Sequence, residues 1–307
     1  MYLNFKLNWM ISCMLIFFTT ALFSQDQTKN SIGDAVYEEY QQNGIDDALD
    51  KYKDLKKNNS NEYNWTEWEL NRIGYQLMLD DKDMDAAEKV LKYNMEEYPK
   101  AANPRDSYAD YLIAQGNEEE AKKYLKESIQ MAKNSAVENE KTQIYRGSTA
   151  KLARLEKEDQ QLNFLSGNWN VHIVNYDKGK EMGSFDGKVL STFNDNNNIL
   201  TSEFVNSLGE TVNQRILVYD ALDKKYDMAY IDPAEPLGIN LSTVTIKNAA
   251  GNSFEMMEEY TNREGLKKSA KHEIVKESDG KLIWTISEQG DDKSWEKGSV
   301  WTYNKEM

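Results

Sequence analysis

The chain has 307 residues and carries 52 acidic against 37 basic side chains, so its formal net charge is −15 at pH 7. No block of Lys and Arg interrupts this acidity, which argues against nucleic-acid binding, because phosphate recognition depends on clustered positive charge. The single cysteine, Cys13, lies in an apolar N-terminal run. The rest of the chain therefore excludes disulfides, zinc-thiolate sites, iron–sulfur clusters and cysteine nucleophiles.

The first 24 residues are typical of an export signal. Lys6 precedes an apolar run of about 15 residues, at 9–23, and Ser24 supplies a small residue before a polar stretch. The run is shorter than the roughly 20 residues that cross a bilayer as a helix. We therefore expect cleavage after Ser24 and an exported protein, periplasmic or secreted, with no transmembrane span left. A retained anchor and a lipid-anchored Cys13 are the alternatives.

A helical unit recurs between residues 34 and 131. Gly74 is followed twelve residues later by Ala86, and Ala109 is followed at the same interval by Ala121. Apolar residues surround these small residues at helical spacing, and a partial copy precedes them. The pattern predicts pairs of helices that approach closely at the small residues.

This stretch resembles tetratricopeptide repeats, which have small residues at two fixed positions and a proline after the second helix. Pro99 follows the first full copy one residue late, and no proline follows the second. The resemblance implies a concave groove that binds a peptide or protein partner. The residues placed in that groove by position are Trp68, Asn71, Tyr75, Asp106 and Asp110, with Met78, Asn103 and Ile113 beside them. Packing of Trp68 and Met78 against their neighbours is the alternative.

The segment from residue 132 to 161 is expected to close the repeat array. Two and a half repeats are fewer than the roughly three that a solenoid needs. Ile144, Tyr145 and Leu152 are spaced for one apolar side of a helix that is otherwise rich in charge. We expect a capping helix over 141–161, followed by the link to a second domain.

The side-chain pattern changes near Gly167, from helical spacing to period-two alternation. Clusters of Gly, Asn and Asp interrupt the alternation about every ten residues, as in short hairpins. About ten antiparallel strands with no helix between them favour an up-and-down meander, which loses its edges by closing into a barrel. The first strand is expected to begin at Trp169, and the others at 185–193, 199–206, 212–219, 226–231, 241–246, 254–260, 268–276, 282–288 and 295–303.

The entry to this domain, Gly167-Asn168-Trp169, resembles the glycine-x-tryptophan opening of lipocalin-like (calycin) barrels, which small uncharacterised domains of exported bacterial proteins share. The resemblance covers about 140 residues and implies that Trp169 closes one end of the barrel, beneath a cavity. That family packs an arginine from the last strand over the tryptophan. No arginine matches here, and Lys305 is the nearest basic residue.

Aromatic residues are plentiful in the strand region and are expected inside the barrel. Small barrels either fill with such side chains or hold one apolar ligand, and both alternatives stay open here. The candidates for ligand binding in the barrel interior are Trp169, Phe185, Tyr230, His272 and Trp284.

The sequence offers few groups suited to catalysis or metal binding. Of its two histidines, His172 is expected on the surface, whereas His272 shares a strand side with Ile274 and is expected inside. They cannot form a short-spaced zinc motif, and the adjacent acids Glu258 and Glu259 point to opposite faces of a strand. We therefore predict no catalytic residue, no metal site and no cofactor. Haem ligation by His272 is the alternative, since related barrels bind haem through one histidine.

The sequence thus predicts an α+β protein of several parts. These are a signal peptide at 1–24, helical repeats at 32–131, a capping helix and linker at 132–161, and an antiparallel β-barrel of about ten strands at 162–307. The expected function is that of an exported, non-enzymatic binding protein whose repeats contact a peptide or protein partner and whose barrel holds a small hydrophobic ligand. The alternative is a barrel-based enzyme that uses His272 or an inward carboxylate such as Glu203 as its base.

Overall fold

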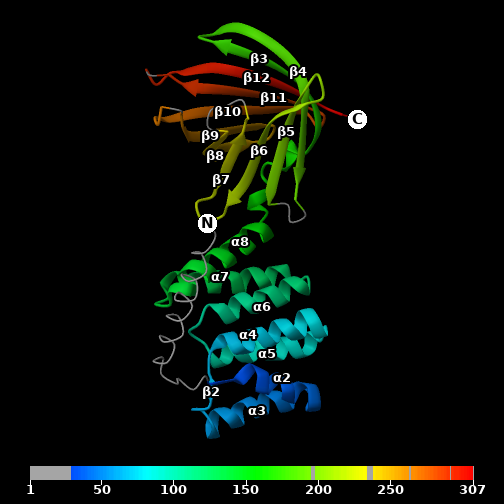
Figure 1. Ribbon diagram of the computed structural model, residues 1–307, viewed down its shortest axis with the longest axis vertical. Helices are drawn as coiled ribbons and strands as arrows, with labels where there is room; N and C mark the ends of the chain where they lie inside the picture. The colour runs from blue at the N-terminus through cyan, green and yellow to red at the C-terminus, as the bar shows by residue number, and fades with distance from the viewer. Residues whose placement is uncertain (1–28, 195–197, 234–237, 263, 291, 307) are drawn as a thin grey trace, which may run out of the picture. The chain divides into compact units, whose positions relative to one another are not determined.

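The computed structural model describes residues 29–194, 198–233, 238–262, 264–290 and 292–306. The predicted signal peptide at 1–24 lies outside these residues. The chain divides into two compact units, Met1–Tyr111 and Leu112–Met307. The predicted fold class is confirmed, because helices come first and a closed antiparallel barrel of ten strands follows (Figure 1).

The helices of the first unit form consecutive pairs. α2 packs against α3, and α4 packs against α5, with a π-helical turn between the members of the second pair. The two-residue strands β1 and β2 pair in parallel just before α2 and α4, and α6 follows α5. The bounds are β1 Asn30–Ser31, α2 Ile32–Asn43, α3 Ile45–Asn58, β2 Tyr63–Asn64, α4 Glu67–Gln76, the π turn Leu77–Asp81, α5 Met84–Glu97 and α6 Asn103–Ala114.

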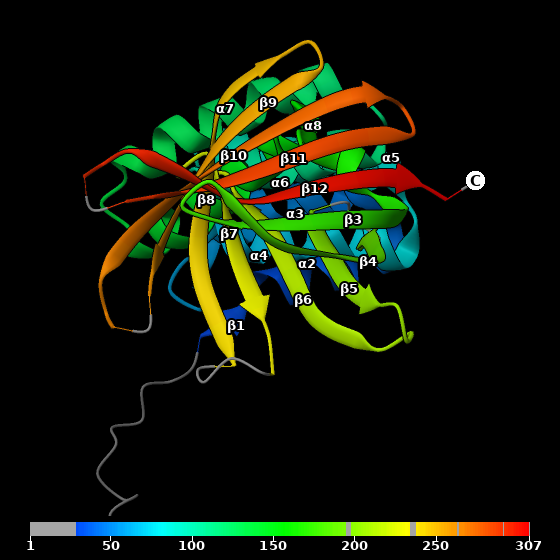
Figure 2. The ribbon, with the colours of Figure 1, turned by 90° about the horizontal axis from the view of Figure 1, so that it is seen from above.

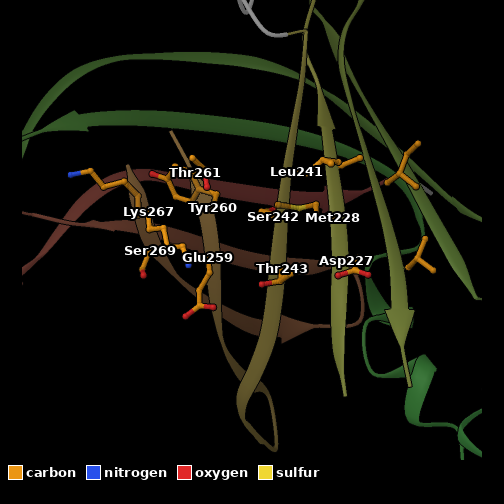
Figure 3. A pocket seen from close by; sticks show the side chains of 14 residues that line it. Asp227, Met228, Leu241, Ser242, Thr243, Glu259, Tyr260, Thr261, Lys267 and Ser269 are labelled. Carbon is orange, nitrogen blue, oxygen red and sulfur yellow. The ribbon is translucent and has the colours of Figure 1, made fainter. Parts of the chain in front are cut away.

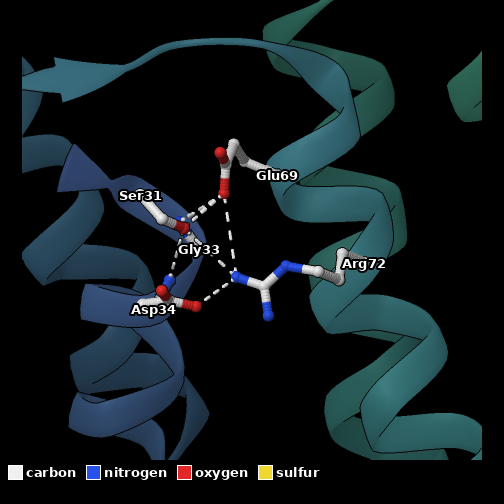
Figure 4. A network of polar contacts seen from close by, with 5 residues as sticks. All are labelled: Ser31, Gly33, Asp34, Glu69 and Arg72. Carbon is white, nitrogen blue, oxygen red and sulfur yellow. Dashed lines mark hydrogen bonds and ion pairs between the residues drawn. The ribbon is translucent and has the colours of Figure 1, made fainter. Parts of the chain in front are cut away.

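A network of polar contacts joins the start of α2 to α4 (Figure 4). The Ser31 hydroxyl accepts a hydrogen bond from the Asp34 N–H at 3.0 Å and donates one to the Glu69 carboxylate at 2.6 Å. That carboxylate also accepts from the Gly33 N–H at 3.2 Å, and Arg72 reaches Asp34 at 2.5 Å. The first N–H groups of α2 thereby gain partners, and the Glu69 charge suits the positive end of the helix dipole.

The small residues of the repeating pattern lie where helices meet. Ala86 is buried at the start of α5, and Ala48 is buried in α3. Gly74 lies closest to its neighbour, since a Cβ added there would be 2.4 Å from Cδ2 of Leu91 on α5. The expected close approach of paired helices is therefore confirmed at Gly74.

In the second unit, α7 (Glu118–Asn134) packs against α8 (Tyr145–Leu155). The hydroxyls of Ser128 and Ser148 meet at 3.0 Å between them. The helix expected over 141–161 is found in three pieces, namely a π-helical turn at Glu140–Ile144, α8 itself, and a 3₁₀ turn at Glu158–Gln160. A second 3₁₀ turn, Asn163–Leu165, leads into the first barrel strand.

The ten barrel strands follow one another around the barrel in chain order, and β12 pairs back to β3 (Figures 1 and 2). Both sides of every barrel strand are therefore hydrogen-bonded, as the predicted up-and-down meander requires. The bounds are β3 Gly167–Asp177, β4 Lys180–Phe193, β5 Ile199–Asn206, β6 Thr211–Asp220, β7 Lys225–Ile231, β8 Ile239–Ala250, β9 Ser253–Thr261, β10 Lys267–Ser278, β11 Lys281–Gln289 and β12 Trp295–Lys305.

Alternate residues of each strand form the barrel core. Trp169, Val171 and Ile173 of β3 share one face with the fully buried Ile274 of β10, as the alternation predicts. Most of the aromatic residues expected inside belong to this core or pack against it, namely Phe193, Tyr219, Tyr226, Phe254, Trp284, Trp301 and Tyr303. One end of the core is covered by Leu162 and Leu165 from the 3₁₀ segment before β3.

Candidate functional site

Trp169 closes one end of the barrel. Its indole N–H donates to the Leu165 carbonyl at 3.0 Å, and Tyr226 donates to the Asp159 carbonyl at 3.2 Å, so the segment before β3 is fastened beneath the strands. The Lys305 ammonium lies 5.4 Å from the centre of the Trp169 ring. Lys305 therefore covers the tryptophan as a cation over an aromatic face.

Further inside the barrel, three side chains from neighbouring strands form a hydrogen-bonded chain. His272 is 4% exposed, and its Nε2 lies 2.9 Å from the Glu258 carboxylate. The Trp284 indole N–H lies 3.1 Å from the other ring nitrogen, Nδ1. Because an indole only donates, Nδ1 must accept, and the proton lies on Nε2. The imidazole is thus neutral and donates to Glu258.

Glu258 is charged in this setting. Burial favours the protonated form and would raise the pKa of its carboxyl. The hydrogen bonds from His272 and Ser242, together with the positive charge of Arg215, outweigh burial and hold the pKa of Glu258 below its ordinary value. The interior therefore contains a carboxylate that accepts a hydrogen bond rather than a neutral acid.

Arg215 brings the opposite charge to the same region. Its guanidinium lies 5.1 Å from the centre of the Trp284 ring, in a cation–π contact. Its Nε is buried without a hydrogen-bond partner, and Arg215 forms no ion pair among the residues that the structure describes. A buried donor without a partner among the described residues thus faces the interior.

A small cavity lies beside Arg215. Its volume is about 30 Å³, which is room for a water molecule or a group of two or three heavy atoms. The walls combine polar and aromatic side chains. They are Leu165, Val189, Ser191, Ser202, Phe204, Asn213, Arg215, Leu217, Trp284, Trp301 and Tyr303.

A larger pocket, which we call the mouth pocket, lies at the barrel end away from Trp169, where β7 turns into β8. Its volume is about 430 Å³, within the range of sites for small organic molecules. Tyr230, Asn240 and Tyr260 contribute from the inward-facing side of their strands, and Asp232, Glu264 and Glu288 add negative charge. In the strand register Tyr230, which lines the mouth pocket, is the neighbour of Arg215, which lines the cavity.

The residues around His272 do not fit a haem. Both ring nitrogens are engaged, Nδ1 by Trp284 and Nε2 by Glu258, so neither has a lone pair directed into open space. The adjoining cavity of about 30 Å³ is also far smaller than a porphyrin. His272 instead belongs to a hydrogen-bonded chain that holds Trp284 in place.

The interior candidates lie in different places. Trp169 is at the closed end, His272 and Trp284 share the polar chain, and Tyr230 lines the mouth pocket, donating to Asp232 at 3.5 Å. Phe185 packs edge-on against Phe204, 6.1 Å between ring centres, but is 44% exposed at the rim.

The inward position that the alternative enzyme hypothesis requires of Glu203 is wrong. Phe204 and Ser202 take the inner side of β5, so Glu203 lies on the outer face and accepts from Gln214 at 3.0 Å. Glu203 and His272 therefore do not converge, and the acid beside His272 is Glu258. His172 lies on the outer surface as expected, 2.8 Å from Asp186.

The helical candidates are mostly buried between helices. Asn71 is 3% exposed and accepts from Asn94 at 2.8 Å, and Asp106 is buried as well. The Tyr75 hydroxyl donates to Asp110 at 2.5 Å, and burial followed by the Asp110 charge raises the pKa of Tyr75. These placements favour packing roles for Asn71, Tyr75 and Asp106. Trp68 differs, since it is 46% exposed on α4.

The outer face of the barrel carries a groove that the sequence did not suggest (Figure 3). Its volume is about 650 Å³, and it crosses the outward side of β6 to β10. Leu241 is 71% exposed in it, with Asp227, Glu259 and Lys267 around it. The sequence feature that could have predicted this groove is the apolar pair Ile239 and Leu241, which faces outward and alternates with the inward-facing Asn240 and Ser242.

Neither a metal site nor a membrane-spanning helix is present among the described residues. No group of three or more His, Cys, Asp or Glu side chains in that part of the chain is arranged to hold a metal ion. No helix within it is long and apolar enough to cross a bilayer.

Comparisons with known proteins assign no family to the chain. No protein-family model matches it, and no curated protein matches it. Among solved structures, it is similar to Rv2717c from M. tuberculosis, with 11% identity and a TM-score of 0.34 over 49% of this chain and 98% of that one. It is also similar to EF1p2_mFAP2b bound to DFHBI, with 13% identity and a TM-score of 0.25 over 48% and 99%. A redesigned β-barrel, b11L5F_LGL, gives 8% identity and a TM-score of 0.24 over 47% and 94%.

Proposed function

We propose that this protein is an exported, non-enzymatic binding protein whose lipocalin-like barrel takes a small, largely apolar molecule through the mouth pocket. The observation that carries the proposal is the pocket of about 430 Å³ with inward-facing Tyr230, Asn240 and Tyr260 on its walls. Aromatic walls with a few polar groups are the usual composition of small-molecule sites. A ligand that covered about 300 Å² of apolar surface would gain about 7 kcal/mol before ordering costs.

The proposal is tested with N-phenyl-1-naphthylamine, a neutral apolar fluorophore. The full chain is titrated with the dye, and its fluorescence gives the affinity. Asn240→Trp places a large side chain inside the mouth pocket and is expected to weaken binding at least about tenfold. Leu241→Trp, one residue along and outward-facing, is the matched control and should leave the affinity unchanged. Equal affinities for all three proteins, or no binding by the wild type, would refute a ligand site in the mouth.

The second part of the proposal concerns the helices, which we take as tetratricopeptide-like repeats that contact a peptide or protein partner. Trp68 is the candidate that supports it, because large aromatic side chains exposed on a helix surface are typical anchors in interfaces. A tiled peptide array is probed with the full chain. Trp68→Ala should abolish the binding of selected peptides, whereas Leu208→Ala, at a still more exposed apolar residue in a barrel turn, should not.

A further inference from the structure

We propose that the closed end of the barrel carries a second binding site, in which Lys276 and Lys305 bind a phosphate group. The site is a surface pocket of about 250 Å³, which we call the closed-end pocket. It lies at the Trp169 end of the barrel and shares no lining residue with the mouth pocket. The proposal is therefore independent of the proposed function of the barrel.

Both lysines occupy the inward-facing side of a strand, where small barrels place the side chains that fill them. Lys276 follows the buried Ile274 by two residues on β10, and Lys305 follows the buried Tyr303 by two residues on β12. The strand alternation thus brings two cations to the same end of the barrel core, where both line the closed-end pocket.

Aromatic rings hold both ammonium groups in place. The Lys276 ammonium lies 5.2 Å from the centre of the Phe164 ring, and the Lys305 ammonium lies 5.4 Å from that of Trp169. A ring face attracts a cation but does not neutralise it, and neither lysine forms an ion pair among the described residues. In a chain with a net charge of −15, the pocket therefore has two cations that no carboxylate of the described chain pairs with.

Neutral donors line the same pocket. The Ser278 hydroxyl accepts from the Gly280 N–H at 3.3 Å, and its own proton has no acceptor among the described residues. The side-chain amide of Asn163 is likewise without a partner in that part of the chain. Coverage of the rings explains the apolar stems of the lysines, but it leaves these N–H and O–H groups unused.

A phosphate group matches this set of donors. It has several acceptor oxygens and carries a charge of about −1.5 to −2 at pH 7 as a monoester, so it can use two ammonium groups where a carboxylate would use one. Pockets for drug-sized molecules begin at roughly 300 Å³. The closed-end pocket is smaller, so we expect it to hold the phosphate group with at most a small body attached.

Asp279 is the acid on the pocket wall. Its carboxylate forms no ion pair among the described residues, so it repels a bound anion without neutralising either lysine. The site thus makes two opposite predictions. Loss of a lysine should weaken phosphate binding, and loss of the Asp279 charge should strengthen it.

The test measures the binding of three phosphate probes to the full chain. Inorganic phosphate and phenyl phosphate are titrated by calorimetry, and vesicles of phosphatidylcholine with phosphatidic acid are tested by sedimentation. Binding of inorganic phosphate would identify the free anion as the source, binding of phenyl phosphate alone a monoester, and binding of the vesicles alone a lipid headgroup. Lys276→Met and Lys305→Met keep an unbranched side chain over the ring, and each should weaken binding at least about tenfold. Asp279→Asn should tighten it about threefold.

Lys281→Met is the matched control. Lys281 begins β11 at the same end of the barrel, but its ammonium is paired with Glu277 at 2.7 Å and does not line the pocket. It should change the affinity less than about twofold. Far-UV circular dichroism and the melting temperature establish that each variant is folded, and the exposed Asp279→Asn decides the question if the lysine variants do not fold.

The site is refuted if the wild type binds none of the three probes, if Lys281→Met weakens binding as much as Lys276→Met does, or if Asp279→Asn fails to tighten it. The lysine variants should bind N-phenyl-1-naphthylamine as the wild type does, because the mouth pocket does not contain these residues. Failure of the phosphate site therefore leaves the proposed function standing, and the reverse also holds.

Discussion

The indole N–H of Trp284 donates a hydrogen bond of 3.1 Å to Nδ1 of His272. Because Nδ1 accepts this bond, the imidazole proton lies on Nε2. Nε2 is therefore the atom that donates a hydrogen bond to Glu258. It joins an aromatic wall of the barrel to its buried charges.

Trp284→Phe should destabilise the protein. The substitution removes the donor and leaves a buried imidazole nitrogen without a partner, which costs about 1–3 kcal/mol in unfolding free energy. Urea denaturation followed by circular dichroism measures the loss. Trp295→Phe, a partly exposed residue at the start of β12, is the control and should change stability by no more than about 0.5 kcal/mol. ¹⁵N NMR of the wild type should show His272 Nδ1 as the nitrogen without a proton. A proton on Nδ1 would contradict the assignment.

Glu258→Gln should remove part of the protein's stability near neutral pH and alter its response to acid. The pKa of Glu258 lies below its ordinary value of 4.5 in the folded protein, so folding is favoured by its ionised form. That contribution is complete above the unfolded-state pKa and is lost as pH falls through the folded-state pKa. Replacing a charge-assisted bond with a neutral one costs about 1 kcal/mol at pH 7.

The measurement is urea unfolding of wild type and Glu258→Gln between pH 7 and pH 3. The difference between the two should stay constant down to about pH 5 and shrink below it, because the wild-type carboxylate then becomes protonated. A difference that grows on acidification would mean that Glu258 is neutral in the folded state.

Gly74→Ala should destabilise the helical unit. The added methyl group would lie 2.4 Å from Cδ2 of Leu91, and overpacking of this kind costs about 1–3 kcal/mol. Gly147→Ala in α8 is a matched comparison, since nothing lies within 4 Å of its added Cβ. It should stabilise by about 0.5–1 kcal/mol through helix propensity. Thermal unfolding measures the melting temperature of each variant against that of the wild type. An unchanged melting temperature for Gly74→Ala would contradict the close contact between the helices.

Ser31→Ala should weaken the start of α2. It removes the acceptor for the Asp34 N–H and the donor to Glu69, and loss of such a cap costs about 1 kcal/mol. Thr66 also occupies an N-cap position, before α4, but makes no side-chain capping bond. Thr66→Ala should therefore have a smaller effect, and hydrogen exchange of the first turns of α2 and α4 should rise in the Ser31 variant alone.

The barrel strands are predictable because one side of each strand is buried and the alternation is therefore strong. β5 is expected at 199–206 and found at Ile199–Asn206. β8 is longer than expected, Ile239–Ala250 instead of 241–246, because the register shifts between Ile246 and Asn248 and the alternation is interrupted there. Because a period-two pattern ends where the alternation is interrupted, it does not predict that the strand continues beyond the bulge.

The polar interior is less predictable. The inward position of His272 follows from Ala270 and Ile274 on the same side of β10. Charged residues such as Arg215 and Glu258 are mostly exposed in proteins, so the sequence alone predicts that they lie on the surface. Arg215 lies on β6 and Glu258 on β9, which are not neighbours in the sheet, so a single sequence does not bring the two residues together. Glu203 was considered as an inward base, but Ser202 and Phe204 beside it take the inner side of β5.

The pairing of β12 with β3 has a consequence for how the barrel forms. The contact between Lys305 and Trp169 joins residues that are 136 positions apart, and contacts of such long range are slow to form. Until Trp295–Lys305 is available, both β3 and β11 keep an unpaired edge. A chain that is still emerging from a ribosome therefore stays open and can pair with the strands of other chains, and a holdase chaperone at that stage should raise the yield of folded protein.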